Sequence, residues 1–426
     1  MFKIINTLLF LSCFFSTLHA QDFVKVEDGE FFIGDKPYTF LGANYWYGPY
    51  LGVTEQGQDR LKEELDQLES LGVKNLRIMA AFEGQDGDLW RAIPGIQQQA
   101  GIYDERILQG LDWLLVEMEK RNMKAVLVLN NFWLWSGGMA QYVQWTDSTA
   151  IPTPTPYDGS AYPAYTKYTA QFFTNKKAIE LYNQYVSMLV KRVNSITDTP
   201  YVSDPTILSW QLANEPRGMN QVKAYRAWIQ QTAQLIRALD SNHLISIGSE
   251  GNTTTPIPNG LNFLVDHDVP EIDYCTFHLW IQNWGLFDPM EADKTFKQSL
   301  KFAKKYIKNH IKDAQKLGKP LVLEEFGVSR DLNDHHWDAS TTYRDQYYDF
   351  IFKLCQKSIQ RGSGLVGCNF WAYGGLGRPR EAHGIWKPGD DFIGDPPHEF
   401  QGWYSVYNTD LSTLEVIQKN AQLINQ

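Results

Sequence analysis

The chain of 426 residues predicts a single α/β domain folded as a (β/α)8 or TIM barrel, with long loops on the face formed by the carboxyl ends of its strands. Eight short apolar runs recur along the sequence, amphipathic segments separate most of them, and no change of composition divides the chain. An open doubly wound sheet is the alternative. Such a sheet usually has a glycine-rich turn after its first strand, and Gly42-Ala43-Asn44 supplies none.

The eight runs are rich in β-branched and aromatic residues and are apolar on both faces, as the strands of a covered parallel sheet are. They comprise residues 38–44, 73–79, 124–131, 207–214, 244–249, 274–279, 320–326 and 364–371. Apolar residues at helical spacing predict helices between most of these runs. The clearest of these segments are residues 60–71, 107–121, 178–193, 225–239, 296–317 and 343–359.

Two connections are too long to be plain loops. Residues 131–175 contain Trp133, Trp135, Trp145 and a ladder of alternating prolines, and residues 378–404 contain Pro396-Pro397. Both leave the carboxyl end of a predicted strand, where barrel enzymes build their sites. We expect them to wall an extended cleft, with their aromatic side chains facing a ligand.

Composition and charge narrow the class of ligand. The formal net charge is −10, from 49 acidic and 39 basic residues, and no long run of one sign occurs, so neither nucleic acid nor an anionic membrane is expected as a partner. The chain has 14 Trp, 22 Tyr and 23 Phe. Surplus Trp and Tyr suit stacking against sugar rings, although an aromatic core would explain the same count.

The first twenty residues predict an export signal. Lys3 precedes an apolar stretch over residues 4–15, and small residues lead to Ala20, after which we expect cleavage. Residues 21–426 would then form the catalytic domain of a secreted or periplasmic protein. Lipidation of Cys13 is the alternative, although Phe10-Leu11-Ser12 is a poor approach to such a site. No later stretch is long and apolar enough to span a membrane.

The mature chain would keep Cys275, Cys355 and Cys368, which are too widely spread to form a disulfide framework. Cys275 and Cys368 lie inside apolar runs, so we expect them to be buried thiols that act as small hydrophobic side chains.

Two glutamates stand where predicted strands end. Glu215 follows the fourth run and Glu325 closes the seventh. A carboxylate at the end of an apolar strand is costly to desolvate unless it is paired or used. Glycoside hydrolysis needs such a pair, because one carboxyl protonates the leaving oxygen while the other attacks the anomeric carbon or activates water. Two salt-bridged barrel ends are the structural alternative.

The surrounding motifs resemble glycoside hydrolase family 5, and within it the endo-β-1,4-mannanases. The pieces that carry this resemblance run through nearly all of the mature chain. They are Gly42-Ala43-Asn44-Tyr45-Trp46, Asn75-Leu76-Arg77-Ile78, Leu129-Asn130-Asn131, Ala213-Asn214-Glu215-Pro216-Arg217, Thr276-Phe277-His278, Glu324-Glu325-Phe326-Gly327 and Phe370-Trp371-Ala372-Tyr373-Gly374.

The resemblance implies that Glu215 is the general acid/base and that Glu325 is the nucleophile of a retaining enzyme, with carboxyls about 5 to 5.5 Å apart and a covalent intermediate. Neighbouring strand residues point to opposite faces, so we expect only one of Glu324 and Glu325 to enter the cleft. Arg77 should lower the pKa of Glu325. Glu215 should keep its proton in a less cationic place, which predicts a bell-shaped pH profile.

The same resemblance implies that Asn214 binds the sugar 2-hydroxyl and that Trp371 stacks under the sugar at the cleavage point. His278 would hold the site in position. Structural alternatives remain for three of these residues: an ion pair for Arg77, a satisfied barrel histidine for His278 and core packing for Trp371.

Three further residues are expected to contact substrate. Many family members carry a tyrosine two residues after the histidine, with its hydroxyl on the nucleophile. This chain has Trp280 there, and its indole can donate but cannot accept a hydrogen bond. No tyrosine role is therefore carried over, and Trp280 is expected only to wall the cleft, as is Trp133. Arg217 resembles the arginine that mannanases place toward the leaving group, with a loop salt bridge as its alternative.

These residues predict a monomeric endo-β-1,4-mannanase that cuts mannan, glucomannan or galactomannan and their oligosaccharides with no metal and no organic cofactor. His267, His335 and His336 lack metal-ligand spacing. A β-1,4-glucanase is the nearest alternative, because glucose and mannose differ only at the 2-hydroxyl. A non-catalytic glycan-binding protein and a transglycosylase also remain open.

Overall fold

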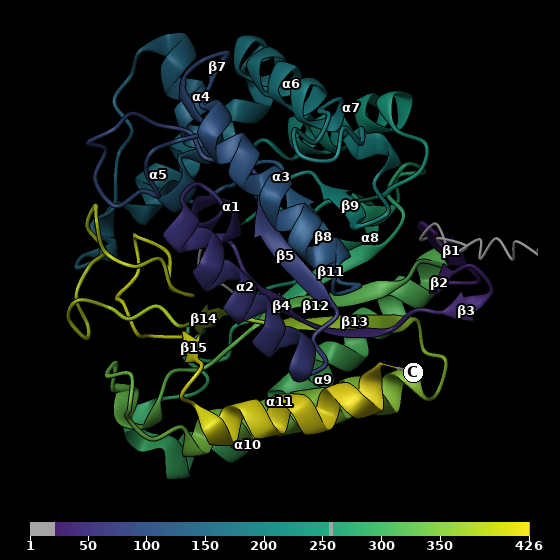
Figure 1. Cartoon of the computed structure of the whole chain (residues 1–426), viewed down its shortest axis with the longest axis vertical. Coiled ribbons are helices and arrows are strands. Elements are labelled where there is room, and N and C mark those ends of the chain that lie inside the picture. The colour runs from purple at the N-terminus through teal and green to yellow at the C-terminus, as the bar shows by residue number, and fades with distance from the viewer. Residues whose placement is uncertain (1–21, 255–258, 426) are drawn as a thin grey trace, which may run out of the picture.

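The computed structural model describes residues 22–254 and 259–425 and confirms the predicted barrel (Figure 1). Its strands are β4 (Phe40–Asn44), β5 (Asn75–Met79), β8 (Lys124–Val128), β9 (Ile207–Gln211), β10 (Leu244–Ser246), β11 (Cys275–Leu279), β12 (Leu321–Phe326) and β13 (Leu365–Phe370). Each lies within one of the eight apolar runs, and every described residue of these strands is buried, as covered parallel strands require.

The strands form one parallel sheet in the order β10-β9-β8-β5-β4-β13-β12-β11. Its two edges are joined by backbone hydrogen bonds from Asp273 N–H to the Ile245 carbonyl (2.9 Å) and from His278 N–H to the Glu250 carbonyl (3.2 Å). The sheet therefore closes on itself, and the carboxyl ends of all eight strands meet at one face.

Helices surround the sheet (Figure 1). Six coincide with the predicted segments: α2 (Glu55–Ser70), α3 (Glu105–Glu119), α6 (Lys176–Val190), α7 (Val222–Leu239), α9 (Ala292–Leu317) and α10 (Thr342–Ile359). Further helices that were not predicted are α1 (Gly48–Leu51), α4 (Gly138–Asp147), α5 (Tyr162–Thr169), α8 (Phe263–His267) and α11 (Leu411–Ile424). The last of these follows β13 and packs beside α10, so it completes the helical layer.

A small antiparallel sheet covers the amino-terminal end of the barrel. It consists of β1 (Val24–Glu27), β2 (Glu30–Ile33) and β3 (Lys36–Pro37). Val24 and Phe31 form an apolar cluster with residues near the amino ends of the barrel strands, among them Phe40 and Val322. Burying this end against its own sheet leaves the opposite end for the site.

The long connections at the carboxyl face contain structure of their own. The segment after β8 holds α4 and α5, and the segment after β13 holds β14 (Tyr373–Gly375), which pairs with β15 (Val406–Tyr407). A further hairpin of β6 (Gln97–Gln99) and β7 (Ile102–Tyr103) follows β5. The carboxylate of Asp395 accepts hydrogen bonds from the backbone N–H groups of Gly402 and Tyr404, which fixes the loop before β15.

Cys275 and Cys368 are buried free thiols, as expected, and Cys355 is a third. Over residues 22–254 and 259–425, no helix has both the length and the apolarity needed to cross a bilayer. The expected signal segment, including Lys3, Cys13 and Ala20, lies outside the described residues, and its processing stays a prediction.

Candidate active site

A cavity of about 610 Å³ opens at the carboxyl ends of the strands. Its lining brings together Glu215 and Glu325 with the other predicted ligand contacts Trp133, Asn214, Arg217, Trp280 and Trp371. The two long connections supply much of its wall, through Pro154, Tyr162, His398 and Trp403 among others. Trp135 also lines the cavity, whereas Trp145, expected to face a ligand, packs edge-on against Tyr142 instead.

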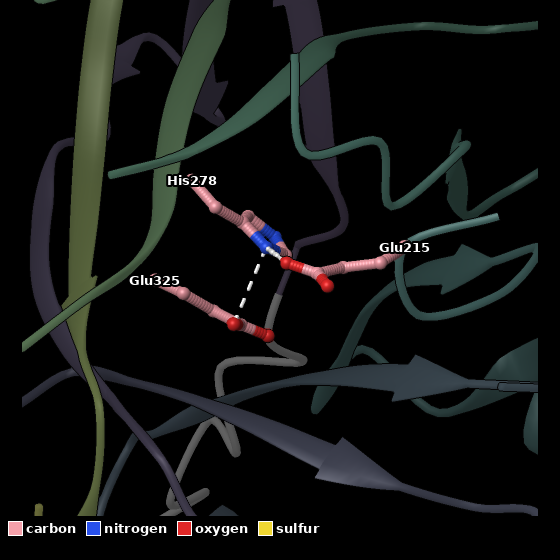
Figure 2. A group of neighbouring side chains, drawn as sticks. All are labelled: Glu215, His278 and Glu325. Carbon is pink, nitrogen blue, oxygen red and sulfur yellow. Dashed lines mark hydrogen bonds and ion pairs between the residues drawn. The ribbon is translucent and has the colours of Figure 1, made fainter. Parts of the chain in front are cut away.

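Glu215 and Glu325 meet at His278, as Figure 2 shows. The imidazole Nδ1 lies 2.5 Å from Glu215 Oε1 and 3.2 Å from Glu325 Oε2. One oxygen from each carboxyl and one nitrogen of His278 all lie within 4.8 Å of one another. Two carboxyls from opposite parts of the barrel thus face a common point, with an imidazole between them.

Glu215 takes an unusual backbone conformation. Its φ is +49°, in the left-handed region that residues other than glycine rarely adopt. Its backbone N–H donates to the Gly248 carbonyl (2.9 Å). Such a conformation costs about 1–3 kcal/mol and persists where the surroundings hold it. The turn aims the carboxyl of Glu215 toward Glu325 immediately after the strand ends.

Glu325 lines the cavity and Glu324 does not, as expected, but the expected reason, that the two side chains point to opposite faces of the strand, was wrong. Phe277 pairs with Leu323 and His278 pairs with Glu325, so Glu324 is an extra residue in its strand, a β-bulge. The carboxylate of Glu324 accepts both hydrogen bonds from Gln211 Nε2 (2.7 and 2.9 Å), which comes from β9. Glu324 therefore points into the barrel below the site, and Glu325 enters the cavity above it.

Arg77 connects the nucleophile candidate to the sugar-binding candidate. Its Nη1 pairs with Glu325 Oε1, and its Nη2 donates to Asn214 Oδ1 (2.8 Å). The same guanidinium donates to Gln211 Oε1 (2.8 Å) and Asn44 Oδ1 (3.2 Å). These contacts fix the guanidinium, so Glu325 and Asn214 are held by one rigid group.

The expectation that Glu215 occupies a less cationic place was wrong for the ligand-free protein. Burial raises the pKa of Glu215, but the His278 imidazolium, Arg217 and the Trp133 indole outweigh it and lower that pKa to about 2. The carboxylates in turn raise the pKa of His278 to about 10. The proton of this pair therefore rests on His278, 2.5 Å from the Glu215 oxygen.

Arg77 does lie beside Glu325 and lowers its pKa, as expected, and so does His278. Burial is the larger effect and leaves the pKa of Glu325 above its usual value. Desolvation thus dominates because the carboxyl is buried against the barrel end.

Indole N–H groups contact both carboxyls, which the sequence did not predict. Trp133 Nε1 donates to Glu215 Oε2 (2.6 Å), and Trp280 Nε1 donates to Glu325 Oε2 (3.3 Å). Trp280 therefore does more than wall the cleft, because its donor occupies the place expected for a tyrosine hydroxyl. Trp371 is 4% exposed and packs edge-on against Trp280, with ring centroids 6.0 Å apart.

Two further carboxyls of this site were missed, one on buried Glu250 and one on half-buried Glu399. Glu250, after β10, pairs with Arg217 through Oε1 (2.5 Å) and Oε2 (2.9 Å). Glu399 lines the cavity, burial raises its pKa well above its usual range, and its Oε2 has no hydrogen-bond partner among the described residues. Glu250 directly follows the fifth apolar run, residues 244–249, so the signal that located Glu215 was present there and was not used. Glu399 lies within a long connection, where the sequence offered no such signal.

The two long connections contact each other across one side of the cavity. His398 Nε2 donates to the Pro154 carbonyl (2.9 Å), and Tyr162 Oη lies 3.4 Å from His398 Nδ1. The rings of Tyr157 and Phe400 pack edge-on beside this contact, 5.8 Å apart. These loops therefore form a bridge at one edge of the cleft.

Glu215, His278 and Glu325 are also the one group of ligand type, among the described residues, that could hold a cation. The three side chains already satisfy one another through His278 Nδ1. The arrangement is thus suited to sharing a proton between two carboxyls.

Comparison with known proteins supports the interpretation of this cavity as an active site. Residues 21–426 match the family described as GH family 5 beta-mannosidase-like. A mannan endo-1,4-beta-mannosidase of Solanum lycopersicum is 30% identical over 359 residues, covering 81% of this chain and 80% of that protein.

Solved structures agree. A glycoside hydrolase family 5 mannosidase from Rhizomucor miehei is 34% identical with a TM-score of 0.86, covering 94% of this chain and 97% of that one. A mutant of that mannosidase in complex with mannosyl-fructose is 33% identical with a TM-score of 0.84, covering 95% of this chain and 99% of that one. An endo-1,4-beta-mannanase from the same fungus, at 22% identity and a TM-score of 0.71, covers 95% of this chain and 99% of its own and shares the fold. The chain therefore belongs to the mannosidase-like group of glycoside hydrolase family 5 and is a glycoside hydrolase.

Proposed function

We propose that this enzyme hydrolyses β-1,4-linked mannosides by a retaining double displacement in which Glu325 is the nucleophile and Glu215 the acid/base. The observation that carries the proposal is the approach of the two carboxyls, whose oxygens lie within 4.8 Å of each other. Retaining glycosidases hold their carboxyls about 5 to 5.5 Å apart, whereas inverting enzymes need about 6.5 to 9.5 Å to admit a water.

In the first step Glu325 attacks the anomeric carbon, and the bond to the leaving sugar oxygen breaks as that oxygen takes a proton from Glu215. The proton reaches Glu215 from His278, because the two groups share it across 2.5 Å. Binding of a sugar in the cavity excludes water and favours the neutral form of the carboxyl, which moves the proton onto Glu215.

In the second step a water gives its proton to Glu215 and attacks the same carbon, which releases Glu325 and preserves the β configuration. Arg77 and Trp280 donate hydrogen bonds to Glu325, so they stabilise the carboxylate as it leaves.

Asn214 is placed to contact the sugar 2-hydroxyl. Its Oδ1 accepts from Arg77 (2.8 Å) and its Nδ2 donates to Asn131 Oδ1 (3.1 Å), so its amide cannot rotate. A hydrogen bond between a fixed amide and this hydroxyl strengthens as the oxocarbenium-like transition state forms. Because mannose and glucose differ at this hydroxyl, Asn214 is a contact through which the two sugars can be told apart.

The bridge between His398 and Pro154 supports attack near a chain end, because a polymer cannot pass through a cleft that is closed at one side. The free carboxyl of Glu399 beside it can accept hydrogen bonds from the hydroxyls of a terminal mannose. The complex of the similar Rhizomucor miehei mannosidase mutant with mannosyl-fructose, a disaccharide, supports a short substrate. We therefore propose manno-oligosaccharides, and the ends of mannan chains, as the preferred substrates.

Endo attack on mannan, glucomannan or galactomannan is the second candidate, and it is the mode that the sequence predicts. The plant relatives named mannan endo-1,4-beta-mannosidase support it at 30% identity. For endo action, both ends of the bound sugar chain would have to leave the cavity on the side opposite the bridge.

Products formed from mannohexaose and from linear mannan distinguish the two modes. Attack at chain ends releases one small sugar from the first minutes and barely lowers the viscosity of mannan, whereas endo attack gives mixed oligosaccharides and a rapid loss of viscosity. NMR of the fresh reducing end should show the β anomer. An initial α anomer, or faster turnover of carboxymethyl cellulose than of mannan, would overturn the proposal.

Glu325→Ala separates catalysis from binding. The variant should lose several orders of magnitude in kcat while still binding mannotriose. A glycan-binding protein would show no turnover in the parent chain. We further propose that the enzyme is exported through residues 1–20, which N-terminal sequencing of the mature protein tests directly.

A further inference from the structure

Glu250 and Arg217 form a buried ion pair next to the acid/base candidate. Both carboxylate oxygens of Glu250 accept hydrogen bonds from the guanidinium, at 2.5 and 2.9 Å, and the two residues are 2% and 6% exposed. Burial raises the pKa of Glu250 to about 7, although Arg217 opposes this. A protonated carboxyl would direct its O–H against one of the two donors, so the paired geometry is that of ionised Glu250. Its backbone carbonyl accepts the His278 N–H (3.2 Å), which anchors it to the edge of the barrel.

Arg217 links this pair to Glu215 through an aromatic ring. The guanidinium carbon lies 4.8 Å from the centre of the Trp133 ring, and the indole N–H of Trp133 donates to Glu215 Oε2 (2.6 Å). A cation over an indole face is attracted to the ring and strengthens its N–H as a donor. The ion pair, the indole and the acid/base carboxyl thus form one contiguous chain of contacts.

The charges in this chain act on Glu215 in opposite directions. Arg217 lowers the pKa of Glu215. Glu215 raises the pKa of Glu250 because the two are like charges, and by the same repulsion an ionised Glu250 disfavours ionisation of Glu215. An arginine with no partner here would turn its full charge toward Glu215 and stabilise the ionised carboxylate, which cannot donate a proton. Pairing with Glu250 limits that effect.

We propose that Glu250 is a positioning residue: it holds Arg217 against the Trp133 ring and neutralises it, so that Glu215 can carry the proton needed by the leaving oxygen. This inference rests on the proposed acid/base role of Glu215. It assigns to Glu250 and Arg217 a control over proton transfer that is separate from any contact with the leaving sugar.

Several other titratable groups also act on the Glu215 carboxyl, and the substitutions that test the proposal leave them unchanged. Those that face Glu215 from neighbouring elements are His278 from β11, Glu325 from β12, Glu399 from the segment after β13 and Tyr306 from α9. Glu250 is faced by Arg217, Glu215, His278, Tyr225 and Tyr306.

Two substitutions should move the pH profile in opposite directions. In Glu250→Gln the charge of Arg217 is no longer neutralised, so the basic limb of kcat/KM for mannobiose should move to lower pH by about one unit. In Arg217→Met the cation is lost and the isolated Glu250 takes up a proton, so the same limb should move to higher pH. The double variant should return close to the parent profile.

The leaving group provides a second readout. Hydrolysis of mannobiose needs protonation of the leaving oxygen, whereas 2,4-dinitrophenolate leaves without it. For Glu250→Gln we expect kcat/KM to fall about tenfold or more on mannobiose at neutral pH, and by less than threefold on 2,4-dinitrophenyl β-mannoside. A merely structural role, or a general loss of folding, would lower both rates alike.

A matched control is the buried pair of Asp112 and Arg192, whose Oδ2 and Nη2 lie 2.6 Å apart in the outer helical layer. Asp112→Asn should leave the pH limbs in place. Equal shifts in Glu250→Gln and Arg217→Met, or no shift in either, would overturn the inference. Glu215→Ala tests the underlying function separately: persistence of mannobiose hydrolysis and of its basic limb in that variant would refute the acid/base role itself.

Discussion

Arg77→Lys tests whether the guanidinium in the barrel organises the nucleophile or only completes an ion pair. Arg77 is 3% exposed and makes hydrogen bonds to Gln211, Asn44, Asn214 and Glu325. A lysine keeps the positive charge, but its single ammonium cannot reach acceptors spread over that fork. The substitution therefore removes geometry while it preserves charge.

The loss of stability in Arg77→Lys follows from the hydrogen-bond acceptors that are left without a donor. At least two buried amide oxygens lose their partner, and each costs about 1–3 kcal/mol, so we expect the free energy of unfolding to fall by about 2–6 kcal/mol. An unfolding entropy of about 2.1 cal/mol/K per residue over this chain converts that loss into a Tm lower by roughly 2–7 °C. Differential scanning calorimetry measures it.

The catalytic effect is larger than a loss of packing would produce. Glu325 and Asn214 both lose a rigid partner, and a loss of about 1.5–3 kcal/mol in the transition state lowers kcat/KM by about 10- to 150-fold. Weaker pairing also raises the pKa of Glu325, which is already raised by burial. Because Glu325 must be ionised to attack, the acid limb of the pH profile should move to higher pH.

Arg192→Lys is the control, because Arg192 is 8% exposed in its side chain and pairs with buried Asp112 away from the cavity. It should lower the Tm without changing the pH profile. If Arg77→Lys lowered the Tm to a similar extent but left kcat/KM within threefold and the acid limb in place, Arg77 would be an ordinary structural ion pair and the reasoning would fail.

Further expectations follow from other contacts of the site and core. Trp280→Phe removes the N–H that reaches Glu325 (3.3 Å) and should lower kcat/KM about three- to tenfold, whereas a slower reaction only in the Trp280→Ala variant would assign Trp280 to stacking alone. Burial lowers the pKa of His310 to about 4, so the unfolded chain binds more protons than the folded one between about pH 6.5 and 4 and stability should fall as the pH drops through that window. Urea unfolding at pH 7 and pH 4.5 measures the loss, at most about 3 kcal/mol for this histidine, and His310→Gln should reduce it. Zn²⁺ should inhibit reversibly by binding Glu215, His278 and Glu325, and substrate should protect; inhibition that persists in Glu325→Ala would place the ion elsewhere.

The periodic pattern of the sequence determined the architecture. Runs apolar on both faces can be buried only in a covered parallel sheet, and their alternation with amphipathic segments admits few folds. The same local pattern located Glu215 and Glu325, because Glu215 directly follows one apolar run and Glu325 lies at the end of another. The segment over α11 was not singled out, although it completes the helical layer.

What the tertiary structure decided is how groups distant in the sequence act on one another. The bulge at Glu324 depends on how β12 pairs with β11, and it turns two successive glutamates inward against the alternation expected of a strand. The pKa values of Glu215 and His278 depend on their 2.5 Å approach and on burial. Which of the two holds the proton could therefore not be inferred from residue types. Glu250, Glu399 and the contact of His398 with Pro154 arise from loops whose positions follow from packing. Periodicity is a local property that a sequence displays directly, whereas electrostatic coupling depends on distances that exist only once the chain has folded.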